Sequence, residues 1–533
     1  MLQADMKHVN HRDLLLYGLL FALALLLVYL RAMPFITAMP ATDQGYFLYI
    51  GKAILSGQVL YRDIWDHKGP VIFFIDALGF ALAGKSAWGV WAVEYCSMLL
   101  AALWGFITLS RAFGQKSAAL GTLLWIFSLV LVMEEGNSTE TYALIFSFLI
   151  FANYLHTCRT APLRRSACLI GVCGALCFFE RPNLIGALLV CVTAWTVQAA
   201  ISHRWRAWAT NIIYTGLGFL CVTLLISGYF LYYHALGAMY DAMLYYNMKY
   251  AAIHHSVSNR IYAAAFGMIK LGPLSFIAVL MWCAVVKQIR RIASRQNVLN
   301  DVLLFALISM PIEFVLAILA GNNFYHYFVM LLLPISILTT WGVAILLRGI
   351  SLLPNWLEPD SPMSSALSIR ENYVCFALLL IMVTPYIVAQ KPYILYLLKP
   401  ATLRTERRPL VRYLAADYIT SHTAPGDSVY IWGFDFCVLY AAKRHSPIKY
   451  SDIMPFITPN YDPQPHIASF LHDLTEHSPR LIIDMTEPDS TVSLPKIFGH
   501  NDIQQARAIW AYICQNYHQV EIAPGAIAYQ RKM

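Results

Sequence analysis

The sequence predicts a polytopic α-helical membrane protein that ends in a small α/β domain. Hydrophobic residues make up 59% of the 533 residues and charged residues only 13%, about half the usual charged share of a soluble domain. The apolar residues are gathered in runs of about 17–25, the length that crosses a bilayer as a helix. From about residue 405 the chain becomes polar, and helix and strand patterns alternate.

The net charge and the cysteines exclude two other kinds of protein. The charge of +8 comes from short basic clusters between apolar runs, as the positive-inside rule requires. These clusters lack the aromatic interleaving that nucleic acid needs, so no nucleic-acid partner is predicted. Most of the eleven cysteines lie in apolar runs without a CxxC pair or Cys/His metal spacing, so neither a zinc site nor a disulfide framework is predicted.

About eleven membrane spans follow from the apolar runs and the placement of Lys and Arg. Lys7 and Arg12 precede the first run, which predicts a cytoplasmic N-terminus. The run 69–84 is short, and counting it as a span would place the later basic clusters outside, so we expect it to be a juxtamembrane helix. The predicted spans are 14–33, 87–110, 117–133, 141–157, 166–179, 184–200, 210–233, 261–286, 302–320, 324–347 and 372–390.

The predicted domains are a transmembrane domain at 1–390, with its first outer loop at 34–86, and a soluble outer domain at 391–533. The soluble domain contains no glycine-rich phosphate loop and is therefore not expected to bind a nucleotide. Its expected elements are strands at 427–433 and 480–485, helices at 465–478 and 502–517, and a hairpin at 520–531 that turns at Pro524-Gly525.

Ionisable and polar aromatic residues gather in the segments that are predicted to lie outside. In the first outer loop they are Asp43-Gln44-Gly45-Tyr46, Arg62-Asp63 and Asp66-His67-Lys68. In later segments they are Glu134-Glu135, Asn137 to Glu140, Glu180-Arg181 and Tyr325-His326-Tyr327. An active site on the non-cytoplasmic side would produce this asymmetry.

The order and spacing of these motifs resemble the GT-C glycosyltransferases, particularly the branch of protein mannosyltransferases and the aminoarabinose transferase of lipid A. Those enzymes carry an acid after the first span, then a Lys/His-x-Pro element and a juxtamembrane helix. Asp43 and the stretch 67–70 match that order. The stretches around Glu140, Arg181 and His326 resemble three further family elements.

The sequence also departs from the family pattern at two places. Gln44 replaces the usual second acid, which disfavours a carboxylate-bound metal, so no metal site and no required cofactor are expected. Asn322-Asn323 stands where the family often has an arginine.

The resemblance implies an inverting transfer of a monosaccharide from a polyprenyl-phosphate donor. Cleavage of the anomeric C–O bond leaves a phosphate that cations must stabilise, and the acceptor hydroxyl needs a carboxylate to take its proton. We therefore expect Asp43 to act as the base and Glu140 to hold the acceptor or assist. The residues expected at the donor and its phosphate are Lys68, Arg181, His326, Tyr327, Tyr46 and His67.

Several of these residues also have a structural interpretation. Lys68 could be an interfacial anchor, Glu140 could cap the following helix, and His326 would fit an aromatic belt. Asp66 is interpreted as a structural residue of its loop. Glu313 lies inside a predicted span, where an acid is by default a functional hypothesis.

The expected location is the bacterial cytoplasmic (inner) membrane, with the C-terminal domain on the periplasmic or extracellular side. The donor would then be linked to undecaprenyl phosphate, and the acceptor would be an envelope glycan, glycolipid or protein that the C-terminal domain helps to position. A transporter or flippase is the main alternative, although it predicts inverted repeats. An O-antigen ligase or polymerase and a membrane scaffold are further alternatives. The sequence predicts neither the sugar nor the acceptor.

Overall fold

The structure is a computed structural model that divides into two compact units, which are described separately. The first unit contains Met1–Leu30, Glu94–Leu225 and His254–Ile394, and the second contains Arg31–Val93, Ile226–Ile253 and Leu395–Met533. The structure describes residues 10–34, 39–158, 163–251, 256–289, 292, 297–319, 324–352, 383–394, 410–486, 490–499 and 501–532. Asn322-Asn323 and most of the predicted span 372–390 lie outside these residues.

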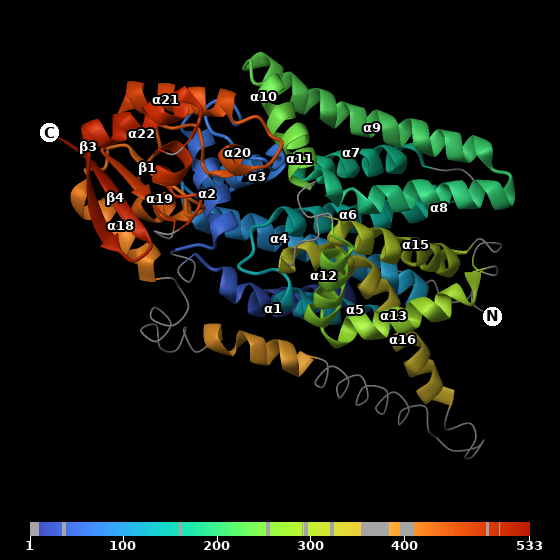
Figure 1. Ribbon diagram of the computed structural model, residues 1–533. Coiled ribbons are helices and arrows are strands. Elements are labelled where there is room, and N and C mark those ends of the chain that lie inside the picture. The colour runs from blue at the N-terminus through green and yellow to red at the C-terminus, as the bar shows by residue number, and fades with distance from the viewer. Residues whose placement is uncertain are drawn as a thin grey trace. The chain divides into compact units, whose positions relative to one another are not determined.

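The first unit is a bundle of apolar helices (Figure 1). Helices α6, α7 and α8 pack against one another, and α16 packs against α5, α13 and α15. The helices wholly or mostly in this unit are α1 (His11–Tyr29), α4 (Ala87–Phe113), α5 (Gln115–Ser128), α6 (Thr139–Thr157), α7 (Arg164–Glu180), α8 (Gly186–Ser202), α9 (Trp205–Tyr232), α12 (Val257–Lys270), α13 (Pro273–Val286), α15 (Val298–Ile318) and α16 (Leu332–Leu352). Shorter helical turns of this unit are η2 (Leu129–Leu131), η3 (Pro182–Leu184) and η5 (Tyr325–Leu331), whereas η1 (Leu30–Ala32) begins at the last residue of the first segment and continues in the second unit.

Several helices are long and apolar enough to cross a membrane, as expected of a multi-pass membrane protein. Within the described residues they number five, namely His11–Ala32, Ala87–Phe113, Trp205–Tyr232, Val298–Ile318 and Tyr325–Arg348. A bent pair of helices, α12 and α13, would make a sixth. The predicted total of about eleven spans therefore stays a prediction.

The predicted span 261–286 is not one straight helix. Helices α12 and α13 meet at a bend of 107°, with Gly272 at φ +73° and Pro273 as the first residue of α13. Glycine adopts this left-handed backbone without a steric penalty, and proline lacks the N–H that would continue the helix. Lys270 is the one charged residue of the run 261–286, so hydropathy alone predicts a single span.

A proline inside α15 is compensated by a neighbouring helix. Pro311 cannot donate a backbone hydrogen bond to Leu307, four residues earlier. The indole Nε1 of Trp282 on α13 donates to the Leu307 carbonyl at 2.9 Å instead. Because an unsatisfied carbonyl in an apolar bundle costs several kcal/mol, this contact explains how α15 tolerates the proline.

The acid predicted to lie inside a membrane span is confirmed as buried. Glu313 on α15 is 1% exposed, and a Cβ added to Gly186, the first residue of α8, would lie 2.3 Å from its carboxylate oxygens. The glycine at position 186 lets the Glu313 carboxylate lie against the first turn of α8, and a larger residue would require that carboxylate to move. The role of Glu313 stays a hypothesis.

The second unit joins the first outer loop to the C-terminal residues. Helix α3 (Pro70–Leu82) lies where a juxtamembrane helix is predicted and begins with a proline at its first turn. Its 13 residues give a length of about 20 Å, short of the roughly 30 Å hydrocarbon core. The other helices are α2 (Thr42–Leu55), α10 (Leu236–Tyr240), η4 (Asp241–Tyr246), α11 (Asn247–Ala251), α18 (Leu410–His422), α19 (Cys437–Ala442), α20 (Met454–Ile457), α21 (Gln464–His477), η8 (Pro495–Gly499) and α22 (Gln504–Asn516).

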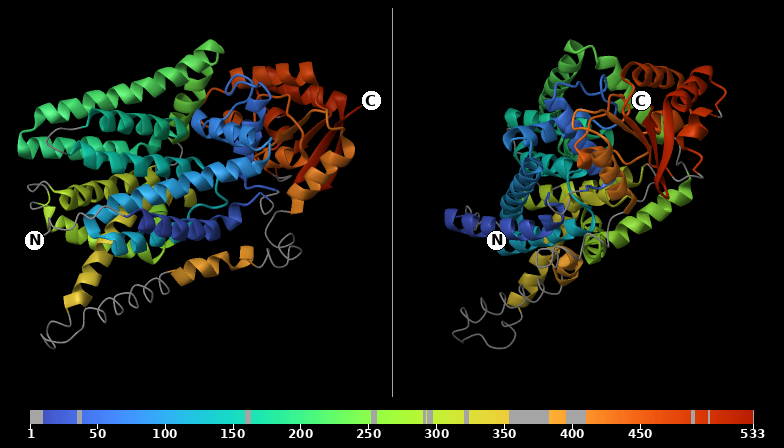
Figure 2. Two further views of the ribbon diagram at one scale, coloured as in Figure 1. Left: turned by 180° about the vertical axis from the view of Figure 1, so that it is seen from behind. Right: turned by 90° about the vertical axis from the view of Figure 1, so that its left-hand side faces the viewer.

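The C-terminal residues form the predicted small sheet. Its strands are β1 (Val429–Trp432), β2 (Leu481–Asp484), β3 (Tyr517–Ala523) and β4 (Ala526–Arg531), in the spatial order β1-β2-β4-β3. Strand β1 pairs with β2 in parallel, and β4 is antiparallel to both β2 and β3. Helices α21 and α22 lie side by side, as both views in Figure 2 show. The predicted strands, helices and hairpin are confirmed. Strands β1 and β2 are buried along their whole length, which explains why their sequences are mostly apolar and do not alternate with polar residues.

Candidate active site

The first-loop acid and lysine that the sequence singles out form an ion pair in the second unit. Lys68 Nζ lies 3.6 Å from Asp43 Oδ2 and 5.1 Å from the centre of the Phe47 ring. The Lys68 side chain is 10% exposed, whereas that of Asp43 is 46% exposed. Asp43 is therefore held by a buried cation and remains open to a molecule from outside.

A second acid of the same loop lies next to this pair. Asp66 is fully buried, and its Oδ1 accepts a hydrogen bond from the Lys68 backbone N–H at 2.9 Å. Its other oxygen, Oδ2, has no hydrogen-bond partner among the described residues. Burial raises the pKa of Asp66, and the positive charge of Lys68 opposes that effect. Asp66 does fix the loop backbone, as predicted, and it also contributes to the field around Lys68.

The C-terminal residues bring a third acid to the loop. The Trp65 N–H donates to the Lys449 carbonyl at 2.8 Å, and the Ser451 hydroxyl donates to the Trp65 carbonyl at 2.6 Å. This pairing places Asp452, which is 5% exposed, within electrostatic reach of Asp66 and Lys68. We call Asp43, Asp66, Lys68 and Asp452 the carboxylate cluster.

The pKa of Asp452 is raised to about 7, first by burial and then by the negative charge of Asp66. The folded protein then holds a proton that the unfolded chain releases near pH 4, so the free energy of unfolding falls as the pH rises from about 4 to about 7. Asp452→Asn is expected to flatten this dependence and to raise Tm at pH 8 by several degrees.

Thermal unfolding of the purified protein at pH 5 and pH 8 checks this expectation. Asp502→Asn, at an exposed position, is the control and should unfold like the wild type. An equally steep pH dependence in Asp452→Asn would contradict the prediction.

Helix α2, which carries Asp43, is positioned by the C-terminal residues. Arg412 donates one hydrogen bond to the Thr42 hydroxyl at 2.8 Å and is also ion-paired with Asp435. A Cβ added to Gly45 would lie 2.2 Å from the Cβ of Cys437 on α19. The glycine of the Asp43-Gln44-Gly45-Tyr46 motif is thus explained by close helix packing.

Two other residues expected at the donor lie in the interior of the second unit. Tyr46 is 3% exposed, and its ring stacks on Phe436 at 5.9 Å. The His67 ring lies 5.3 Å from the ring of Tyr246, and its Nδ1 lies 3.9 Å from Asp66 Oδ1. A role for these two side chains at a donor phosphate stays a prediction.

The first unit contains a separate cluster around Arg181, the residue that follows α7. Its Nη1 lies 3.1 Å from Glu140 Oε1, and its Nη2 donates to the Tyr327 hydroxyl at 2.7 Å. The guanidinium also lies 4.5 Å from the centre of the Tyr327 ring. These contacts hold the guanidinium plane in one orientation, and the side chain is 13% exposed.

His326 extends this cluster. Its Nδ1 lies 3.0 Å from Glu134 Oε1, and its ring packs edge-on against Tyr327 at 4.9 Å. We call Glu134, Glu140, Arg181, His326 and Tyr327 the arginine cluster. Four of its five members, all except Glu134, are residues that the sequence predicts for the site. These four residues come from three separate segments of the chain.

The structure also decides the role of Glu140 at the start of α6. The cap is Ser138, whose hydroxyl accepts from the Thr141 N–H at 3.2 Å, while the Thr141 hydroxyl accepts from the Ser138 N–H at 3.3 Å. Glu140 is 1% exposed and is paired with Arg181 instead. The capping interpretation of Glu140 is therefore wrong.

The sequence interpretation misses one member of the carboxylate cluster, Asp452, and two residues that position the clusters, Glu94 and Arg412. Glu94 on α4 accepts the Asn137 N–H with both carboxylate oxygens at 2.9 Å and so holds the turn before Glu140. An acid within an apolar run was a signal that could have found Glu94. The residues next to Asp452 and Arg412 in the sequence do not identify either of them as a site residue, because both act through contacts with the first outer loop, which is far away in the sequence.

A metal site is not evident in the part of the chain that the structure describes. There, no group of three or more His, Cys, Asp or Glu side chains is arranged to hold an ion.

The architecture defines the class of fold. ArnT from Cupriavidus metallidurans in its apo state is 15% identical to this chain with a TM-score of 0.58, and the match covers 96% of this chain and 97% of ArnT. A structure of ArnT bound to undecaprenyl phosphate matches with the same TM-score at 14% identity. The archaeal oligosaccharyltransferase AglB from Archaeoglobus fulgidus, in complex with an inhibitory peptide and a dolichol-phosphate, is 11% identical with a TM-score of 0.51, covering 97% of this chain and 74% of AglB. The chain therefore shares the fold of ArnT and AglB, as the predicted resemblance implies.

A comparison by sequence identifies the family of the chain. Residues 3–353 match the family described as "Putative competence-induced protein Ccs4 N-terminal domain", and the chain belongs to that family. No curated protein matches the chain by sequence.

Proposed function

We propose that this protein is a glycosyltransferase that moves a monosaccharide from a polyprenyl-phosphate donor to an acceptor hydroxyl. The ion pair between Asp43 and Lys68 carries the proposal. It provides an accessible carboxylate beside a buried cation, in the order and spacing that the GT-C resemblance implies.

Asp43 acts as the general base in this proposal. Its exposed carboxylate accepts the proton of the acceptor hydroxyl as the new glycosidic bond forms. Lys68 holds the carboxylate in place, and the buried side chains of Asp66 and Asp452 interact electrostatically with that lysine. The resemblance implies inversion at the anomeric carbon.

The arginine cluster binds the lipid phosphate. A guanidinium can donate two parallel hydrogen bonds to a phosphate, and such charge-assisted bonds are stronger than neutral ones. Arg181 is already oriented by Glu140 and Tyr327, so little conformational freedom is lost when the phosphate binds. His326 lies next to Tyr327 and supplies a further donor.

The lipid donor is supported by the structural relatives and by the apolar bundle. ArnT is described with undecaprenyl phosphate and AglB with a dolichol-phosphate, and both ligands are polyprenyl-type lipid phosphates. We propose an undecaprenyl-phosphate-linked sugar in a bacterial cytoplasmic membrane, and an envelope glycan, glycolipid or protein as the acceptor. Glu140 holds the arginine in place, and the C-terminal residues position the acceptor.

A transfer assay tests the proposal. The full-length protein in nanodiscs is incubated with radiolabelled polyprenyl-phosphate sugars and envelope extract. We expect one donor to be consumed, with label appearing in the acceptor and free polyprenyl phosphate released in equal amount. If no donor is bound or consumed, the proposal fails. Movement of an intact lipid-linked sugar across proteoliposomes would instead establish a transporter.

A further inference from the structure

A pocket in the second unit lies between the C-terminal half of α2 and the end of α19. Its volume is about 260 Å³, slightly below the roughly 300–1,000 Å³ of pockets that hold drug-sized molecules. Its walls include Tyr49 and Lys52 on one side and Tyr440 and Lys443 on the other. A phosphate with one attached ring suits this volume, whereas a whole lipid is too large.

The charge of the pocket has one sign. Three of its lining residues, Lys52, Lys443 and Arg444, are cations, and none of the lining residues is an acid. Asp76 on α3 acts electrostatically on Tyr440 but is fully buried and does not line the pocket. No ion pair of Lys52 or Lys443 is found within the described ranges of the chain.

Lys52 is held toward the pocket by aromatic rings. Its Nζ lies 4.6 Å from the centre of the Tyr440 ring and 5.2 Å from that of Phe80. Burial, and then the charge of Lys443, lower the pKa of Lys52. An anion bound between the two lysines would remove this repulsion.

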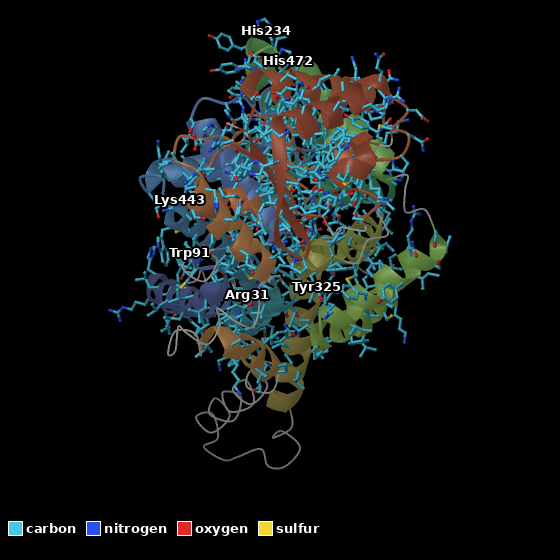
Figure 3. The ribbon with its side chains drawn as sticks, turned by 60° about the vertical axis from the view of Figure 1, so that its left-hand side comes forward. Arg31, Trp91, His234, Tyr325, Lys443 and His472 are labelled. Atoms are coloured by element: carbon cyan, nitrogen blue, oxygen red, sulfur yellow. The ribbon has the colours of Figure 1, made fainter. Side chains whose placement is uncertain are left out.

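The pocket wall opposite Lys52 contains a residue with a left-handed backbone conformation. Lys443, labelled in Figure 3, directly follows α19 and has φ +54°. A glycine would adopt this left-handed backbone more readily, yet the chain has a lysine here. The next residue, Arg444, is fixed by hydrogen bonds from Nε to the Thr423 hydroxyl and from Nη2 to the Thr423 carbonyl, both at 2.9 Å.

We infer that this pocket binds a phosphate monoester or diester, with the two lysines on the phosphate and Tyr440 against the attached group. The inference rests on the proposed function in one respect, because the phosphate would belong to the acceptor of the transfer reaction. This acceptor would be either a phosphorylated glycan or a lipid with a phosphate headgroup. Lysine ammonium groups bind phosphate as compact point charges. The pocket shares no residue with the carboxylate or arginine clusters.

Binding of glucose 1-phosphate to the full-length protein in dodecyl maltoside, a detergent without phosphate, tests the inference, with ³¹P NMR as the readout. We expect saturable binding that unphosphorylated glucose does not displace. Lys52→Gln/Lys443→Gln should weaken it by about tenfold or more, because both charge-assisted contacts to the phosphate are lost. Lys496→Gln, at an exposed lysine of the same unit, should bind like the wild type.

Equal binding by the double variant and the wild type, or displacement by glucose, would overturn the inference. If the double variant does not fold, Lys443→Gln alone serves, since this side chain is exposed and its loss should still weaken binding severalfold. In nanodiscs that contain phosphatidylglycerol, competition with glucose 1-phosphate would identify a lipid headgroup as the source, and its absence would identify a glycan phosphate.

The same samples separate this inference from the proposed function. Polyprenyl phosphate binding should be unchanged in Lys52→Gln/Lys443→Gln. A protein that binds glucose 1-phosphate through the two lysines but consumes no donor would contradict the proposed function and leave the pocket assigned. A protein that transfers sugar but whose double variant still binds glucose 1-phosphate would contradict only the pocket.

Discussion

Replacing Asp43 with Asn is expected to lower the turnover of sugar transfer by about 10²–10⁴-fold, the usual contribution of a general base. Asparagine has nearly the same shape as aspartate but cannot take the proton of the acceptor hydroxyl. The buried Lys68 loses its ion-pair partner but keeps its electrostatic interactions with the side chains of Asp66 and Asp452. Donor binding should therefore persist while turnover is lost.

Single-turnover transfer and donor binding, measured on the same preparation, check this result. Asp63→Asn is a matched control because it makes the same change in the same loop, where Asp63 is paired with Arg62. We expect the control to transfer sugar at close to the wild-type rate. Transfer that survives in Asp43→Asn would preserve the enzyme class but reject Asp43 as the base.

Arg181→Gln is expected to lower the affinity for polyprenyl phosphate by at least tenfold and to destabilise the first unit. The variant removes the charged donor proposed for the phosphate, whose hydrogen bonds are worth about 1.5–3 kcal/mol each. It also removes the ion-pair partner of Glu140, which is 1% exposed, and leaves His326 as its neighbouring basic group. Breaking a buried ion pair from one side costs about 3–5 kcal/mol because the remaining charge stays buried.

A second substitution separates the two effects. In Arg181→Gln/Glu140→Gln the unpaired buried charge is gone, so Tm should recover while polyprenyl phosphate binding stays weak. Arg165→Gln, at an exposed arginine of the same unit, controls for a general loss of positive charge. Recovery of both Tm and binding in the double variant would show that Arg181 has a structural role only.

The sequence determines the features that depend on neighbouring residues. Apolar runs predict the helical bundle, and the period-two and apolar patterns after residue 405 predict the four strands, because burial and backbone hydrogen bonding leave a local pattern. The shortness of the run 69–84 predicts that α3 does not cross the membrane. The motif from Asp43 to Pro70 singles out Asp43 and Lys68 as site residues, whereas their ion pair is seen only in the structure.

The tertiary structure decides the features that depend on distant segments. Asp452 lies near Asp66 because the Lys449 carbonyl and the Ser451 hydroxyl form hydrogen bonds with the backbone of Trp65. The local sequence around residue 452 does not predict this contact. Gly45 is required because Cys437 approaches it.

The same distinction applies to Glu140 and to the bend at Gly272. Glu140 could have capped α6 or paired with a cation, and only the approach of Arg181 from the end of α7 excludes the capping role. Composition likewise does not show that a bend divides α12 from α13. The local sequence pattern therefore predicts which residues are buried. The partner of a buried charge is decided by tertiary packing. A buried charge requires a partner because it has lost its hydration, but this requirement does not specify where in the sequence the partner lies.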